Sequence, residues 1–162
     1  LQLALTKFPN LILDTRETQR QGPSYMVDTL AEIRAESPAR PLILLLGQDA
    51  ANLLHTWFEW QRLFSVAHLV ILTRPDNLLD YPDELAVELT PRLTSEALEL
   101  RSSVCGKVLQ LEVEPIDVSA TRIKQLLSQG ISPAAMLPSI VIEYIQHNHL
   151  YATSLKALRE ES

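Results

Sequence analysis

The segment from Pro41 to Trp60 constrains the fold of this chain more than any other stretch. Its first half, Leu42 to Leu46, is a continuous apolar run bounded by proline and glycine. Such a run favours a strand that is buried on both faces, as in a parallel sheet. Gly47 interrupts the strand, and Asp49 is suited to cap a following helix.

A helix is predicted directly after this turn. Apolar residues recur at helical spacing from Ala50 to Phe64, so we predict one continuous helix in which Trp57 and Trp60 share a face. Phe58 would then be turned away from Trp57. In open α/β sheets, ligands bind at the turn that follows the carboxyl end of a strand. A capped turn without any ligand explains Asp49 equally well.

The rest of the chain continues an alternation of strands and helices, which predicts an α/β fold with a parallel sheet. Further strands are predicted at Leu11–Leu13, His68–Leu72 and Lys107–Val113, the last near a sheet edge. Helices are predicted at Leu1–Leu5, at Tyr25–Ala35 with Ser24 as cap, at Val118–Gln129 before Gly130, and from Pro138 to His147 with Ile140, Val141, Tyr144 and Ile145 on one face. Thr15–Gly22 is expected to form a surface loop, Asn77–Gly106 an irregular insert with a helix near Ser95–Arg101, and Tyr151–Ser162 a helical or frayed tail.

The composition excludes several classes of protein. A net charge of −6 without an evident basic face argues against broad nucleic-acid binding. Cys105 is the single cysteine, which excludes an internal disulfide and fits a reducing, cytoplasmic compartment. No apolar run approaches the roughly 18 residues of a membrane helix. The chain begins with Leu1 instead of methionine, so we expect it to be trimmed or incomplete at its amino end.

A candidate phosphate site lies at Ser119-Ala120-Thr121-Arg122. Two hydroxyl groups, backbone N–H groups and a guanidinium group converge there at a predicted helix N-terminus, where the helix dipole favours anions. The alternative is that Ser119 only caps the helix and that its neighbours are ordinary residues of the first turn.

Other candidates are weaker when taken alone. Trp57 could stack on a heterocyclic ligand, although core packing is the default role of a tryptophan. Arg74 follows a strand end beside the predicted crevice, although a solvated loop arginine is the simpler reading. Asp28 and Thr29 could simply face solvent. The histidines lack the spacing of a metal site, so we predict no metal ligands among them.

Four segments, in order, resemble motifs of one known family. Ser24–Leu30 resembles SYTxDTL, Gly47-Gln48-Asp49 with Trp57 resembles GxD…W, Val118–Lys124 resembles ISxTxIR, and Leu137–Tyr151 resembles LPxxVxxYIxxxxLY. These are motifs of the bacterial nicotinate-nucleotide adenylyltransferases, in the nucleotidylyltransferase superfamily. Each motif is weak alone, but the ordered set is specific. The resemblance implies a Rossmann-like nucleotidylyltransferase fold with a parallel sheet flanked by helices.

The resemblance also implies an activity and a set of site residues. The reaction would be adenylyl transfer from ATP, with Mg²⁺, to nicotinate mononucleotide, giving deamido-NAD and pyrophosphate in NAD biosynthesis. The mononucleotide would lie at Tyr25, Thr29, Gly47, Asp49, Trp57, Phe58 and Arg74, with Trp57 stacked on the ring. The ATP phosphates would be held by Ser119, Thr121 and Arg122. We expect residues 1–162 to form a single domain, with 119–151 as its helical part.

The chain also departs from the family pattern. The GxFDPxHxGH segment, which carries the catalytic histidines, would precede Leu1, so we expect no catalytic residue here, little activity from this chain alone, and a sheet that lacks its first strand. Met26 replaces the usual threonine, and Lys124 replaces an arginine. A pantetheine-phosphate adenylyltransferase, a cytidylyltransferase or a non-catalytic nucleotide-binding module remain alternatives. The sequence does not fix the oligomeric state, and a homo-oligomer stays open.

Overall fold

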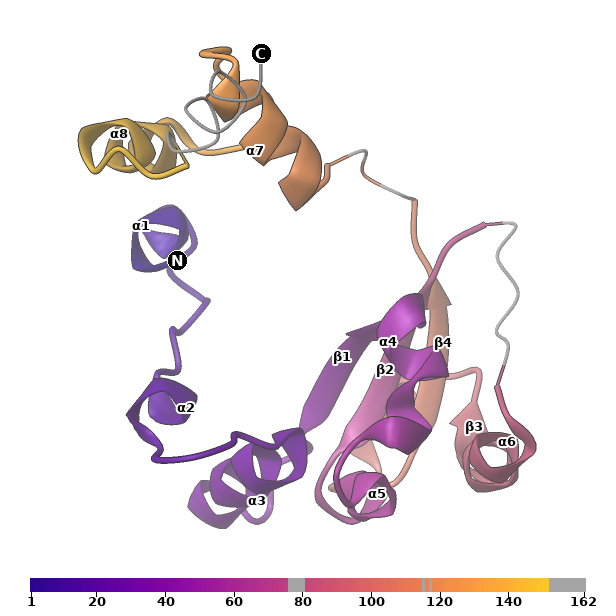
Figure 1. Ribbon diagram of the computed structural model, residues 1–162. Helices are drawn as coiled ribbons and strands as arrows, with labels where there is room; N and C mark the ends of the chain where they lie inside the picture. Colours follow the sequence, from indigo (N-terminus) through magenta and orange to yellow (C-terminus); the bar gives the residue numbers. More distant parts are fainter. Residues whose placement is uncertain (76–80, 115, 117, 152–162) are drawn as a thin grey trace. The chain divides into compact units, whose positions relative to one another are not determined.

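The computed structural model describes residues 1–75, 81–114, 116 and 118–151, and the chain forms two compact units (Figure 1). The larger unit is Thr15–Pro115, and the smaller unit combines Leu1–Asp14 with Ile116–Ser162. None of the helices in the described ranges is long and apolar enough to cross a membrane.

The larger unit is built on a four-stranded parallel sheet in the order β1-β2-β4-β3. Its strands are β1 (Ile43–Gly47), β2 (His68–Thr73), β3 (Leu93–Thr94) and β4 (Val108–Glu112). Three of them were predicted, β1 and β2 from apolar runs and β4 from alternation of apolar and polar residues, and the parallel α/β architecture is confirmed. Because the strands are parallel, the residues that follow β1 and β2 emerge at the same edge of the sheet.

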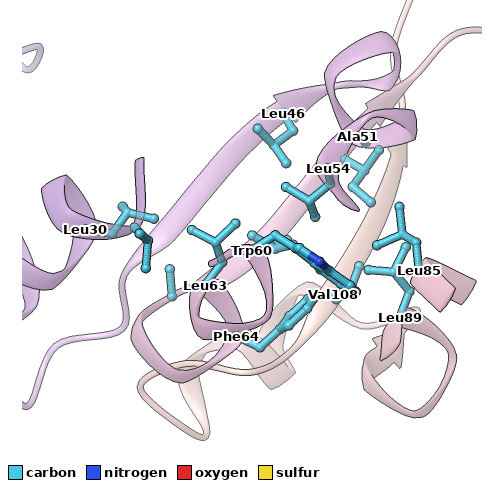
Figure 2. Packing of buried hydrophobic residues seen from close by; sticks show 14 residues of the cluster. Leu30, Leu46, Ala51, Leu54, Trp60, Leu63, Phe64, Leu85, Leu89 and Val108 are labelled. Atoms are coloured by element: carbon cyan, nitrogen blue, oxygen red, sulfur yellow. The ribbon is translucent and has the colours of Figure 1, made fainter. Parts of the chain in front are cut away.

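Helices flank this sheet and cover one of its faces most fully. They are α2 (Arg16–Gln19), α3 (Met26–Glu36), α4 (Gln48–Asn52), η1 (Leu54–Thr56), η2 (Trp60–Arg62), α5 (Leu63–Val66), α6 (Asp83–Leu89), η3 (Thr90–Arg92) and η4 (Ala97–Arg101). The main core joins alternate strand residues such as Leu46 and Val108 to helical residues such as Leu30, Leu54 and Leu85 (Figure 2).

The prediction that the first strand is buried on both faces is wrong for β1. Leu46 is buried, but Ile43 is 42% exposed and Leu45 is 63% exposed. The main core lies on the face that Leu46 shares. A small cluster around Val70 and Leu109 fills only part of the opposite face and does not reach β1. A continuous apolar run therefore identified the strand correctly but overstated its burial.

The continuous helix predicted from Ala50 to Phe64 is also wrong, because the chain breaks there into α4, η1, η2 and α5. Trp57 has extended backbone angles, φ −78° and ψ 148°, and Glu59 is left-handed with φ 47°. Aromatic and β-branched residues in this stretch are weak helix formers. Burial of Leu54 and Trp60 in the core therefore decides the backbone path. Trp57 and Trp60 do not share a helix face.

Neither predicted helix cap forms in the larger unit. The N-cap of α3 is Tyr25 and that of α4 is Gly47, and neither helix has a side-chain cap hydrogen bond. The hydroxyl group of Ser24 instead donates to the carbonyl oxygen of Glu17 at 3.3 Å. Asp49 lies within the first turn of α4.

Several local predictions for the remaining segments need correction. Leu11–Leu13 forms no strand: Leu11 and Ile12 are 57% and 91% exposed, and no described strand pairs with them. The predicted loop Thr15–Gly22 contains α2. In the predicted insert, η4 lies where a helix was expected. The elements α6, η3 and β3 were missed because each is too short to give a clear hydrophobic period. Residues 77–80 of the insert lie outside the described ranges. β3 pairs with β4, so β4 lies inside the sheet.

One arginine ties four segments of the larger unit together. The Nε and Nη2 atoms of Arg34 donate to the carbonyl oxygen of Val66 at 3.0 and 2.8 Å. Its guanidinium group also donates to the carbonyl oxygens of Val104 and Arg40. The end of α3 is thereby fixed to the chain before β1, before β2 and before β4.

The smaller unit contains α1 (Gln2–Leu5), α7 (Ala120–Ser128) and α8 (Ser139–His147). The three predicted helices are confirmed, and α7 ends before Gly130, which has a φ of 73°. Pro138 is the N-cap of α8. The predicted apolar face of α8 is partly wrong, because Ile142 and Ile145 are buried whereas Tyr144 is 51% exposed. Except for Tyr151, the predicted tail lies outside the described ranges.

Candidate functional site

The larger unit contains a pocket of about 380 Å³ with aromatic walls. We call it the aromatic pocket, and it is lined by Glu17, Ser24, Tyr25, Met26, Thr56, Trp57 and Phe58. Small-molecule sites commonly have volumes of about 300–1,000 Å³, with apolar and aromatic walls and a few polar groups. The size and lining of the aromatic pocket fit that description.

Two of the aromatic walls stack on each other. The ring centroids of Tyr25 and Phe58 lie 4.2 Å apart, with 27° between the ring planes. Tyr25 is 38% exposed and Phe58 is 49% exposed, so neither ring is a core residue. The break between η1 and η2 brings Phe58 into the same pocket as Trp57, which a continuous helix would have prevented.

Behind the pocket lies a polar network that sequence reasoning missed. The buried hydroxyl group of Thr29 donates to Glu17 Oε1 at 2.6 Å, and Arg20 donates to the same hydroxyl oxygen at 3.3 Å. Arg20 also pairs with Glu32 at 2.8 Å. Thr29 was predicted to touch the ligand, but it does not line the pocket; it holds Glu17, which does. The charged segment that contains Glu17 and Arg20 was interpreted as a plain surface loop, which hid their role.

The three other residues predicted at the mononucleotide lie at the carboxyl edge of the sheet. Gly47 ends β1 and is in register with Leu72 of β2. The backbone N–H of Arg74 donates to Oε1 of the buried Gln48 side chain at 3.3 Å, which links the turns after both strands. Asp49 and Arg74 are exposed there and are not part of the pocket lining. The predicted convergence of these two turns at one sheet edge is confirmed.

The predicted phosphate-binding residues belong to the smaller unit. Ser119 is the N-cap of α7, and its Oγ accepts a hydrogen bond from the backbone N–H of Arg122 at 3.1 Å. The hydroxyl hydrogen of Ser119 remains available as a donor. Thr121 and Arg122 are exposed in the first turn. Whether Arg122 and Trp57 meet at one site stays a prediction, because they belong to different units.

No metal-binding cluster of three or more His, Cys, Asp or Glu residues occurs among the described residues. His68 is fully buried. Its Nδ1 accepts from the backbone N–H of Lys107 at 3.0 Å, so its Nε2 carries the proton and donates to the carbonyl oxygen of Ser103 at 3.0 Å. This histidine therefore serves the fold, with both ring nitrogens hydrogen-bonded.

The shifted pKa values also lie away from the pocket. Burial raises the pKa of Tyr81 to about 12. A hydrogen bond from Lys107, 2.8 Å away, lowers the pKa of the Glu99 carboxyl group. Neither residue lines the aromatic pocket.

Comparisons with known proteins reveal close relatives in sequence. The chain is 42% identical over 140 residues to a protein of Methylococcus capsulatus and 38% identical over 151 residues to one of Aeromonas salmonicida. Both relatives are described as probable nicotinate-nucleotide adenylyltransferases. The alignments cover 86% and 93% of this chain, and 67% and 71% of the relatives. No protein-family model matches the chain.

Solved structures share the fold. Two structures of the nicotinic acid mononucleotide adenylyltransferase of Plasmodium falciparum, complexed with NaAD and with APC, match with TM-scores of 0.53 and 0.54. Sequence identity is 15% and 14%. The matches cover 82% and 83% of this chain. They cover 60% and 62% of the solved chains, so this chain spans about three fifths of each. The likeness shows a Rossmann-like nucleotidylyltransferase fold.

Proposed function

The chain belongs to the nicotinate-nucleotide adenylyltransferase family, and from that premise we propose that its aromatic pocket holds the pyridine ring of nicotinate mononucleotide. The family reaction transfers the adenylyl group of ATP to this mononucleotide and yields deamido-NAD and pyrophosphate in NAD biosynthesis. The observation that carries the proposal is the gathering of Tyr25, Trp57 and Phe58 around one pocket. Flat aromatic faces are the protein surfaces best suited to stack on a heterocyclic ring.

The start of α3 supplies a partner for the nicotinate carboxylate. Ser24, Tyr25 and Met26 line the pocket where this 11-residue helix begins. No side chain caps the helix, and the N–H of Asp28 donates to the carbonyl oxygen of Tyr25 at 3.1 Å, so the N–H groups that precede Asp28 lack a side-chain acceptor. Those N–H groups and the helix dipole favour an anion. The carboxylate of nicotinate fits this environment better than the neutral amide of nicotinamide does.

The rest of the mononucleotide would extend to the carboxyl edge of the sheet. Gly47 adds no side chain there, and a Cβ at this position would meet open space. The exposed guanidinium group of Arg74 is suited to the phosphate group, and the Asp49 carboxylate is suited to ribose hydroxyl groups. Three residues of the sheet edge would thus continue the site that begins at the aromatic pocket.

The start of α7 would hold the phosphates of ATP. Ser119, Thr121 and Arg122 offer hydroxyl donors and a cation at an exposed helix N-terminus. We propose that Mg²⁺ enters with ATP and is held chiefly by the phosphate oxygens, since the described residues contain no cluster suited to a protein-bound cation. We further propose that residues 1–162 belong to a single nucleotidylyltransferase domain.

Catalysis in this arrangement depends on positioning and charge. A phosphate oxygen of the mononucleotide attacks the α-phosphorus of ATP in line, the bond to the bridging oxygen breaks, and pyrophosphate leaves. No covalent intermediate with the protein is needed. Arg122 would neutralise negative charge on the leaving group, while stacking at Trp57 fixes the attacking nucleotide.

Replacing Arg122 by alanine tests the ATP side of this proposal. We expect the Kd of the chain for ATP, measured by titration calorimetry, to rise about tenfold, since a charge-assisted hydrogen bond contributes about 1.5–3 kcal/mol. The Kd for nicotinate mononucleotide should stay within about twofold, because Arg122 would not touch that ligand.

Arg122→Lys is the matched control, because it retains the positive charge and should lose less ATP affinity. An unchanged Kd for ATP in Arg122→Ala would contradict the assignment of Arg122. Failure of the unaltered chain to bind either nucleotide would contradict the proposed function itself.

A further inference from the structure

The aromatic pocket contains one formal charge, the carboxylate of Glu17. Thr29 donates to Glu17 Oε1 at 2.6 Å and holds the carboxylate, while Ser24 donates to the backbone carbonyl oxygen of Glu17 at 3.3 Å and holds the main chain. The second carboxylate oxygen is not used in the Thr29 contact. The carboxylate thus lies in the same pocket lining as three aromatic side chains, an arrangement that points to a specific kind of ligand.

Glu17 is exposed to solvent, so its carboxylate is accessible to a ligand. None of the ion pairs found in the described part of the chain involves Glu17. Arg20 is the nearest cation in the hydrogen-bond network, but its contacts are with the Thr29 hydroxyl group and with Glu32. The lining of the pocket therefore combines one carboxylate with aromatic walls.

Aromatic faces and a carboxylate together are suited to a cation. The faces of tryptophan, tyrosine and phenylalanine attract positive charge through the ring quadrupole, and quaternary ammonium groups are recognised in this way. The uncapped start of α3 lines the same pocket, and a helix N-terminus favours an anion. A ligand complementary to both features has a positive ring and a negative substituent.

We propose that the aromatic pocket selects the positively charged pyridinium ring itself, and that Glu17 is the residue responsible for this selectivity. The inference rests on the proposed function and deepens it, because nicotinate mononucleotide carries a positive ring nitrogen and a negative carboxylate. Stacking alone would accept any flat ring of the same size. Glu17 adds a charge requirement, and Thr29 and Arg20 act as positioning residues behind it.

A pair of ligands that differ only in ring charge tests the proposal. The first is nicotinate mononucleotide, and the second is its analogue with a 3-carboxyphenyl ring joined to the ribose by carbon, which has the same shape and no ring charge. Binding of each ligand to the chain is measured by titration calorimetry and by quenching of tryptophan fluorescence. We expect the unaltered chain to bind the cationic ring about tenfold more tightly than the neutral ring.

Glu17→Gln is the decisive variant, because its amide oxygen can still accept the hydrogen bond from Thr29 while the charge is lost. We expect the tenfold preference to fall to about threefold, through weaker binding of the cationic ligand alone. Glu17→Asp retains the charge and should retain part of the preference. Glu84→Gln removes the same charge from the exposed surface of α6 and should leave the preference unchanged.

The outcomes separate the two proposals. Equal losses of affinity for both ligands in Glu17→Gln, or no change for either, would overturn the role of Glu17 while leaving nicotinate mononucleotide as the ligand. Equal affinities for both ligands in the unaltered chain would overturn selection of the pyridinium charge. Absence of binding of either ligand would overturn the proposed function and this inference with it.

Discussion

Replacing Trp57 by alanine is expected to weaken binding of nicotinate mononucleotide about 30-fold. Trp57 lines the aromatic pocket beside the stacked rings of Tyr25 and Phe58. Stacking of a base on an aromatic side chain contributes roughly 1–3 kcal/mol by alanine substitution, and 2 kcal/mol corresponds to about a 30-fold change in Kd. Titration calorimetry with the mononucleotide measures the change directly.

Two substitutions control for this result. Trp57→Phe retains a stacking face and should lose less than about fivefold. Trp60→Phe alters a core residue that is 8% exposed and meets Phe64 edge to face, with centroids 6.2 Å apart. It should lower the free energy of unfolding and leave the affinity nearly unchanged. Equal losses of mononucleotide affinity in Trp57→Ala and Trp60→Phe would contradict stacking at Trp57.

Replacing Arg34 by methionine is expected to lower the free energy of unfolding by about 3 kcal/mol. Methionine preserves much of the side-chain length but removes the guanidinium donors to the carbonyl groups of Val66, Val104 and Arg40. The Val104 carbonyl oxygen retains the N–H of Leu42 as a donor at 3.2 Å. A hydrogen bond to a charged group contributes about 1.5–3 kcal/mol, and a buried carbonyl left without a donor carries a further penalty. Urea denaturation followed by circular dichroism measures the loss as a lower midpoint with an unchanged m-value.

Arg101→Met is the matched control for this variant. Arg101 lies at the end of η4 and is exposed, so its replacement should change the free energy of unfolding by less than about 0.5 kcal/mol. If both variants unfold at the same urea concentration, Arg34 does not hold the larger unit together as described.

The strands and the family could be predicted from the sequence because both leave strong local signals. Apolar runs at Leu42–Leu46 and His68–Leu72 identify β1 and β2 without any tertiary information. The ordered motifs indicated the nicotinate branch rather than a pantetheine-phosphate adenylyltransferase or cytidylyltransferase, and relatives at 42% and 38% identity confirm that prediction.

The errors arise where tertiary packing overrides local pattern. The apolar spacing after Ala50 is helical, yet Glu59 adopts a left-handed conformation because the chain turns to bury Trp60. Leu11–Leu13 has strand composition, but a strand requires a partner, and none is found in the described sheet. Burial of β1 likewise depends on what covers each face, which an apolar run cannot specify.

The aromatic residues of the pocket could be predicted from the sequence, whereas its charged residue could not, because that residue depends on tertiary contacts. Tyr25 and Trp57 were found through motifs, and Phe58 through its place beside them. Glu17 was missed because one charged residue in a charged segment gives no signal of its own. The position of its carboxylate in the pocket depends on a hydrogen bond from the Thr29 hydroxyl group, 12 positions further along the chain, which no local sequence pattern encodes.

The Arg34 contacts have a consequence for the order of folding. The guanidinium group of Arg34 binds the carbonyl oxygens of Val66 and Val104, which lie 32 and 70 positions further along the chain than Arg34 itself. These acceptors come together only after the strands have assembled, so we infer that the bonds form after the rate-limiting barrier. Loss of Arg34 should then speed unfolding and leave refolding nearly unchanged in stopped-flow measurements. A slower refolding rate would place Arg34 in the folding nucleus instead.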